Sequence, residues 1–175
     1  MIHVLFVCLG NICRSPIAEA TFQQLVGEAG LSEKIDCDSA ATHRYHLGDL
    51  PDPRTRRNAE SHDLTFTHHC RLLKGEDFRR FDYVIGMDEG NLENIRAIAH
   101  RATGAYPSDE QVFLLRKFDP ERDAGPIPAV PDPFYDDEAA FEEVYQIVRR
   151  CNEQFLQFLI HQHGLVPVRH AVASR

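Results

Sequence analysis

Two cysteines and an arginine lie close together near the start of the chain, in the stretch VLFVCLGNICRSPIAEA at 4–20. Cys8 ends an apolar run, and Arg14 directly follows Cys13. A thiolate is a strong nucleophile, and the planar guanidinium of arginine suits two oxygens of a phosphate or sulfate. This combination predicts a cysteine that attacks an anionic group held beside it.

The segment from Cys8 to Ser15 is expected to join a strand to the first turn of a helix. Free N–H groups and the helix dipole converge at such a junction, so it binds anions and favours a thiolate. Ser15 is predicted to cap the helix and to donate to the sulfur of Cys8. A cysteine and an arginine at this spacing are common by chance, so the flanking strand and helix carry the prediction. The predicted phosphate loop consists of Cys8, Leu9, Gly10, Asn11, Ile12, Cys13, Arg14 and Ser15.

The elements that must position this loop alternate between strands and helices. Apolar runs predict strands at 2–7, 35–40, 82–87 and 111–118, and helical patterns predict helices at 16–29, 53–62, 88–101 and 137–163. This alternation predicts one α/β domain at 1–163: a four-stranded parallel sheet, helices on both faces, and the phosphate loop after the first strand. Ligands bind such sheets at the carboxyl ends of strands. The tail at 164–175 is expected to be disordered.

The composition is that of an ordinary globular protein, with 43% hydrophobic and 26% charged residues. No apolar run is long enough to span a membrane, and the N-terminus lacks the layout of a signal peptide. The net charge is −8 and the cations are not clustered, which argues against a nucleic-acid partner. Five unevenly spaced cysteines argue against a secreted disulfide framework. We therefore expect a cytoplasmic protein without a membrane partner.

The stretch VCLGNICRSP resembles the phosphate loop of the low-molecular-weight protein tyrosine phosphatases, and the resemblance extends over about 160 residues. It implies a hydrolase of phosphotyrosine-like monoesters that forms a phosphocysteine on Cys8 and needs no metal or organic cofactor. The implied partners are a phosphotyrosine-bearing protein or a small aryl phosphate. The resemblance also implies that Cys13 protects an oxidised Cys8 as a reversible disulfide.

Asp132, in VPDPFYDD, is the candidate general acid. Prolines on both sides restrict its backbone, and Phe134 and Tyr135 could form a wall against an aromatic substrate. The tripeptide PDP also occurs at 51–53, so the pattern alone discriminates poorly. In the family that the chain resembles, the acid lies in an Asp-Pro-aromatic segment before the last helix, and Asp132 matches that position.

The resemblance also implies a supporting shell and a second cleft wall. Ser39 and His68 match the serine and histidine that support the phosphate loop through Asn11, although a slip by one residue to His69 stays open. Tyr45 stands where the family commonly has a tryptophan, which leaves the substrate preference open. Two further departures are a proline-rich segment at 118–131 and the extension past the last helix.

Paired histidines raise the question of a metal site, at His43 with His46 and at His68 with His69. No set of cysteines or carboxylates accompanies them, so we predict no metal site. One alternative function is a thioredoxin-coupled arsenate reductase, which needs a third cysteine after the third strand; GMDEGNLENIRAIAH contains none. Another is a non-catalytic module that binds phosphate or phosphopeptides. The physiological substrate and the oligomeric state are not fixed by the sequence.

Overall fold

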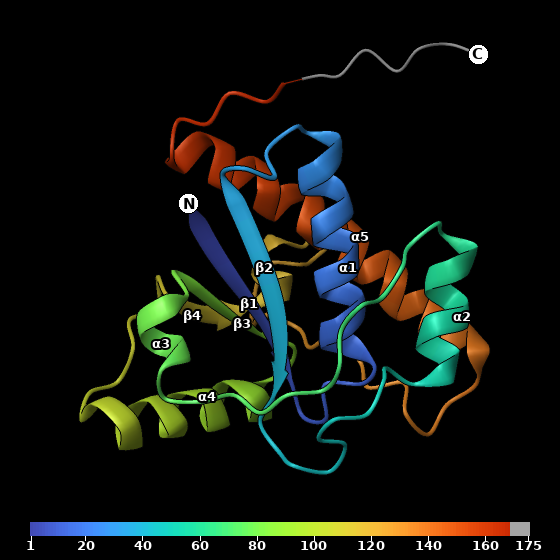
Figure 1. The fold of residues 1–175 in the computed structure, drawn as a ribbon, viewed down its shortest axis with the longest axis horizontal. Coiled ribbons are helices and arrows are strands. Elements are labelled where there is room, and N and C mark those ends of the chain that lie inside the picture. The colour runs from blue at the N-terminus through green and yellow to red at the C-terminus, as the bar shows by residue number, and fades with distance from the viewer. Residues whose placement is uncertain (169–175) are drawn as a thin grey trace.

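The computed structural model describes residues 1–168, and its elements alternate between strands and helices (Figure 1). In chain order they are β1 (Ile2–Cys8), α1 (Arg14–Glu28), β2 (Ile35–Ala41), α2 (Pro53–Ser61), α3 (Asp77–Arg80), β3 (Tyr83–Gly86), α4 (Glu89–Thr103), β4 (Val112–Leu114), the 3-10 helix η1 (Leu115–Phe118) and α5 (Glu138–Gln162). This order confirms the predicted α/β class. The short α3 was not predicted, because four residues are too few to show a helical period.

The sheet has four parallel strands in the order β2-β1-β3-β4. Cys8 at the end of β1 pairs with Ala41 at the end of β2, and Val7 pairs with Gly86 at the end of β3. The carboxyl ends of these strands therefore share one edge. The chain leaves β1 toward β2 and later returns to the other side of β1 as β3. Such a reversal of strand order opens a crevice where open α/β sheets bind their ligands.

Successive side chains of β1 enter two different cores, because neighbouring residues of a strand point to opposite faces. Val4 and Phe6 belong to a cluster formed with α1 and α5, whereas Leu5 and Val7 belong to a cluster formed with α4. Figure 1 shows α1 and α5 together on one side of the strands and α3 and α4 on the other. The prediction of helices on both faces is confirmed.

The start of α1 corrects the prediction that Ser15 caps this helix. The helix begins at Arg14, and its N-cap is Cys13, which already has helical backbone angles and makes no side-chain capping bond. Ser15 is buried within the first turn, and its hydroxyl contacts the sulfur of Cys8. The phosphate loop winds directly into the helix, so no side chain occupies the N–H groups that a cap would bind.

The fourth strand is shorter than predicted. The apolar run at 111–118 forms β4 only over Val112–Leu114 and then coils into η1. Both Phe113 and Phe118 pack against Phe155 of α5, which a straight strand could not achieve, because positions five apart on it face opposite sides. Tertiary packing therefore overrides the extended preference of this run.

Beyond α5 the described chain continues to Val168, whose N–H donates to the carbonyl of Ala29 at 3.0 Å. Residues 169–175 lie outside the described residues, so the predicted disorder of 164–175 and the domain limit at 163 stay predictions. Within 1–168, none of the helices combines the length and the apolar character that crossing a membrane requires.

Candidate active site

The loop after β1 surrounds the sulfur of Cys8 with hydrogen-bonding groups. The N–H of Asn11 donates to this sulfur at 3.3 Å, and the hydroxyl of Ser15 lies 3.0 Å from it. Asn11 has a left-handed backbone with φ of 55°. A left-handed residue after right-handed ones turns successive N–H groups toward one point, which makes an anion-binding concavity. Cys8 thus lies at the base of such a concavity, at the N-terminus of α1.

The side chain of Asn11 holds this loop to three other parts of the fold. Its Nδ2 donates to the hydroxyls of Ser15 and Ser39, each at 2.9 Å. Its Oδ1 accepts from the N–H of Arg71 at 3.1 Å and lies 2.7 Å from Nε2 of His68. The structure thus brings both predicted supporting residues to Asn11. It places His68 at this position, rather than the neighbouring histidine that the alignment left open.

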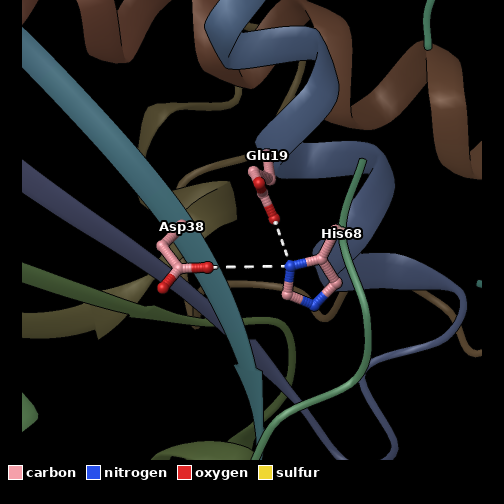
Figure 2. Close-up of side chains that lie close together, drawn as sticks. All are labelled: Glu19, Asp38 and His68. Atoms are coloured by element: carbon pink, nitrogen blue, oxygen red, sulfur yellow. Dashed lines mark ion pairs between the residues drawn. The ribbon is translucent and has the colours of Figure 1, made fainter. Parts of the chain in front are cut away.

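His68 forms a cluster with the buried Glu19 and the partly buried Asp38, two residues that the sequence analysis did not name (Figure 2). Glu19 of α1 accepts from the Ser39 hydroxyl at 2.6 Å, and its Oε2 lies 3.3 Å from Nδ1 of His68. Asp38 of β2 lies 3.6 Å from the same nitrogen. Burial raises the pKa of Glu19 to about 7 and lowers the pKa of His68. The signal that could have found Glu19 is its position four residues, about one helical turn, after Ser15.

The ligand atoms of Glu19, Asp38 and His68 lie within 4.8 Å of one another, which is close enough for a metal ion. The carboxylates already have hydrogen-bond donors, however. Ser39 donates to Glu19, and Nε of Arg71 donates to Asp38 at 2.8 Å. A cation would have to compete with the Arg71 guanidinium at this place. We therefore interpret the cluster as a hydrogen-bonded support for the phosphate loop.

Arg14 is 3% exposed and fixed by acidic partners from two later parts of the chain. Its Nη1 donates to Asp88 at 2.6 Å and to the carbonyl of Val130 at 3.2 Å, and its Nη2 donates to Asp132 at 3.0 Å. Burial acts to lower the pKa of Arg14, but Cys8 and these carboxylates outweigh it and raise that pKa. From the sequence alone, Asp88 was placed only at the start of the predicted helix 88–101. Asp88 lies just after β3, at the edge of the sheet where the strands have their carboxyl ends. This position could have identified it as a site residue, because ligands bind at that edge.

Asp132 stands on the wall of a cleft of about 500 Å³ that opens above Cys8. Its Oδ1 accepts from the N–H of Phe134 at 3.3 Å. Tyr45 and Tyr135 stand at the mouth and are 71% and 94% exposed. The cleft is lined by Cys8, Leu9, Gly10, Ile12, Cys13, Arg14, Tyr45, His46, Asp132, Phe134 and Tyr135. Of these, His46 was not predicted, and its ring lies 6.1 Å from that of Phe134.

The second cysteine of the loop, Cys13, has a thiol that is difficult to ionise. Burial, together with Asp52 and Cys8, raises the pKa of the Cys13 thiol to about 12. Cys13 therefore stays protonated at neutral pH, and its contribution to anion binding is through its backbone. Both cysteines are free thiols in the structure.

Several known proteins with a similar sequence carry one description. The sequence model of the family described as low molecular weight phosphotyrosine protein phosphatase matches residues 3–164. The human protein of that name is 40% identical over 154 residues, covering 88% of this chain and 93% of its own. A low molecular weight protein-tyrosine-phosphatase of Streptomyces coelicolor is 39% identical, covering 88% and 91%.

The solved structures agree with the sequence relatives. The crystal structure of YfkJ from Bacillus subtilis superposes with a TM-score of 0.82 at 36% identity, covering 93% of this chain and 96% of that one. The residues that the family model matches, 3–164, include the phosphate loop, the Asp132 segment and α5. On this shared sequence and fold, the chain belongs to the low molecular weight phosphotyrosine protein phosphatase family.

Proposed function

We propose that this protein hydrolyses phosphotyrosine-like monoesters through a phosphocysteine on Cys8. The observation that carries the proposal is the convergence of three groups on one cleft: the sulfur of Cys8, the guanidinium of Arg14 and the carboxyl of Asp132. The names of the relatives above, phosphotyrosine protein phosphatase and protein-tyrosine-phosphatase, support the proposed substrate class. The proposed substrates are a phosphotyrosine-bearing protein or a small aryl phosphate.

In the first step the Cys8 thiolate attacks phosphorus in line with the bond to the leaving oxygen. The backbone N–H groups of 9–14 and the Arg14 guanidinium hold the equatorial oxygens and neutralise their charge. Nη2 of Arg14 now donates to Asp132, and a bound phosphoryl oxygen would take over that donor. The carboxyl of Asp132 is then released toward the leaving oxygen, to which it gives its proton.

In the second step the roles of Asp132 reverse. Its carboxylate takes a proton from water, the water oxygen bonds to phosphorus, and the sulfur–phosphorus bond breaks. The Ser15 hydroxyl, 3.0 Å from the sulfur, donates to the departing Cys8 thiolate. Phosphate leaves and the starting thiolate is restored, so no oxidant, metal or organic cofactor enters the balance.

The walls of the cleft support an aryl substrate. Phe134 is half-buried in the lining, and Tyr45 and Tyr135 also line the cleft and are largely exposed. Aromatic side chains offer large apolar faces that stack on, or meet edge-on, the ring of a phenyl phosphate. A short alkyl phosphate would leave these faces uncovered.

The proposal is tested by release of phenol from phenyl phosphate, with reductant present and metal excluded by a chelator. We expect Cys8→Ser to abolish turnover while still binding inorganic phosphate. Cys70→Ser is the matched control. The thiol of Cys70 donates to the carbonyl of Gly10, and the hydroxyl of the substituted serine can make the same bond. A wild-type protein that binds phosphate without turnover would support the binding module. Thioredoxin-dependent reduction of arsenate would support the reductase.

The role of Asp132 is tested by the leaving group. Asp132→Asn should lower kcat/KM for phenyl phosphate by roughly 10²-fold or more, the range of general acid catalysis. The loss for p-nitrophenyl phosphate should be much smaller, because nitrophenolate leaves without a proton. Equal losses for the two esters would rule out Asp132 as the acid.

A further inference from the structure

Arg54, the second residue of α2, contacts two separate parts of the active site at once. Its Nε and Nη2 donate to the two carboxylate oxygens of Asp52, at 3.0 and 2.9 Å. Its Nη2 also donates to the carbonyl of Phe134 at 2.9 Å, and its Nη1 donates to the carbonyl of Asp136 at 3.1 Å. One guanidinium thus connects the residue that caps α2 with the loop that carries Asp132.

The Asp52 end of this connection is fixed to the phosphate loop. The N–H of Asp52 donates to the carbonyl of Ile12 at 2.8 Å, and its side chain caps α2 by accepting from the N–H of Arg54. Burial acts to raise the pKa of Asp52, but the hydrogen bonds and charge of Arg54 outweigh it and lower that pKa. Asp52 and Arg54 therefore form a charged pair whose position follows that of the phosphate loop.

The other end holds a segment that has no regular structure of its own. The segment 131–136, here called the acid segment, contains two prolines and begins just after Val130. Within the described part of the chain, its backbone hydrogen bonds to the rest of the protein are those from Arg54 to Phe134 and Asp136. Within the segment, the N–H of Asp136 donates to the carbonyl of Pro133, and the N–H of Phe134 donates to Oδ1 of Asp132.

The flat faces of the guanidinium are also in use. Its central carbon lies 5.8 Å from the ring centre of Phe134 and 4.5 Å from that of Phe141 in α5. Arginine can stack on rings and donate in its own plane at the same time, which the point charge of lysine cannot do. The full set of contacts therefore requires arginine.

We propose that Arg54 is a positioning residue that sets the reach of the catalytic acid, by fixing the acid segment to the phosphate loop. This role for Arg54 rests on the proposed function, in which Asp132 is the catalytic acid. Arg54 does not line the cleft, so it acts on the substrate only through the acid segment. A displacement of a reacting group by about 1 Å costs up to 10²-fold in rate, so removal of Arg54 should slow proton transfer selectively.

A purely structural role for Arg54 predicts a different outcome, and Arg57 provides the comparison. Arg57 lies on the same helix and forms an ion pair with Glu138 in the first turn of α5, so it also connects α2 with the region after the acid segment. It makes no hydrogen bond to the acid segment among the described residues. Arg57→Gln is therefore the matched control for loss of a cation from α2.

The kinetic test compares phenyl phosphate with p-nitrophenyl phosphate. Arg54→Gln should lower kcat/KM for phenyl phosphate by roughly 10-fold and for p-nitrophenyl phosphate by at most about 2-fold, since only the first substrate needs the acid fully. Arg54→Lys should fall between Arg54→Gln and the wild type. Arg57→Gln should leave the ratio of the two substrates unchanged. In an Asp132→Asn background, Arg54→Gln should add less than about 2-fold, because its effect passes through that carboxyl.

Amide hydrogen exchange provides a readout that does not depend on the identity of the acid. Exchange of the amides at 134–136 should become faster in Arg54→Gln and stay unchanged in Arg57→Gln. Unchanged exchange in Arg54→Gln would overturn the proposal for Arg54. The proposal would also be overturned if Arg54→Gln lowered kcat/KM by the same factor in the wild type and in Asp132→Asn. Equal losses on both esters in Asp132→Asn alone would instead overturn the proposed acid. The two failures are thereby distinguished.

Discussion

Asn11 joins two properties that seldom occur in one residue. Its backbone is left-handed, and its buried side chain bonds to Ser15, Ser39, His68 and the backbone of Arg71. Asparagine adopts left-handed angles more readily than other residues with a side chain, because its short amide can bond locally. The amide also has two donors and an acceptor, which are all used here. The loop around Cys8 therefore depends on this side chain in two separable ways.

Two substitutions of Asn11 should separate the contribution of its left-handed backbone from that of its side-chain hydrogen bonds. Asn11→Gly removes the hydrogen bonds but permits the left-handed backbone, whereas Asn11→Ala removes both. We expect Asn11→Ala to have a free energy of unfolding lower than that of Asn11→Gly by about 1–2 kcal/mol, the cost of left-handed angles for a residue with a Cβ. Urea unfolding measures the difference. Equal stability of the two variants would mean that the loop relaxes from φ of 55° without cost.

The residues that sequence reasoning found and those it missed differ in how far along the chain their partners lie. The loop residues from Cys8 to Ser15 are neighbours in sequence, so their joint chemistry was visible in one stretch. Asp88 bonds Arg14 across 74 positions, and Arg54 bonds the acid segment across 80 or more. Such pairs become evident only when the sheet brings strand ends together. A pattern within one segment carries no signal for them.

At the scale of elements, the helix N-termini divide into two kinds. In α2, α4 and α5 an aspartate side chain accepts from the first N–H groups: Asp52 from Arg54, Asp88 from Asn91, and Asp137 from Ala139 and Ala140. In α1 no side chain does so. Uncapped N–H groups are the ones that an external anion can bind. The absence of a cap, which made the prediction for Ser15 wrong, is thus what a phosphate site at α1 requires.

Asp88 caps α4 and also bonds Arg14. A serine in its place can still cap the helix but cannot make the ion pair with Arg14. Asp88→Ser should keep the cap of α4, so any fall in the free energy of unfolding reflects the lost bond to Arg14 and not the helix end. It should lower kcat/KM by roughly 10-fold or more, because a hydrogen bond between charged groups is worth about 1.5–3 kcal/mol. The matched control is Asp137→Ser, which keeps the cap of α5 and should leave kcat/KM unchanged. A similar loss in both variants would mean that helix capping, and not the contact with Arg14, accounts for the effect.

The type of an element was predictable where the apolar pattern of its own residues was enough to determine it. β1 and β2 are buried runs with little competition, and their predicted bounds differ from the observed ones by one residue at the carboxyl end. The run at 111–118 looked equally extended, yet its second half became η1. There the contacts of Phe118 with Phe155 and Phe158 decide the backbone, and α5 lies far along the sequence. Local preference is a weak guide when a distant helix supplies the packing.

At the scale of the whole molecule, the cluster of Glu19, Asp38 and His68 makes the free energy of unfolding depend on pH. Glu19 has an ordinary pKa of 4.5 and one of about 7 in the folded protein, chiefly because of burial. Between these values the folded state binds more protons than the unfolded state. The free energy of unfolding therefore falls as the pH rises through this window. His68, whose pKa is lowered, makes the opposite contribution at the acidic side of its ordinary value.

Glu19→Gln should remove the pH dependence of stability that comes from Glu19 and keep the one that comes from His68. We expect the wild type to lose stability relative to Glu19→Gln as the pH rises from about 4.5 to 7, by an amount on the order of 3 kcal/mol. Urea unfolding at several pH values gives the difference. Glu28→Gln, at an exposed carboxylate on the same helix, is the control and should show no such trend. A constant difference between wild type and Glu19→Gln would contradict the burial of an ionisable Glu19.

The bond between Arg14 and Asp132 spans 118 positions of the chain, and this separation has a consequence for synthesis. A ribosome adds about 5–20 residues per second, so the loop with the proposed nucleophile leaves it roughly ten seconds before the proposed acid does. Throughout that interval the nascent chain contains Cys8 and Arg14 but not yet Asp132. Under the proposed mechanism, a chain that ends before Asp132 can neither protonate a leaving phenol nor activate water through this residue. The order of residues in the chain would therefore delay activity until translation has passed Asp132.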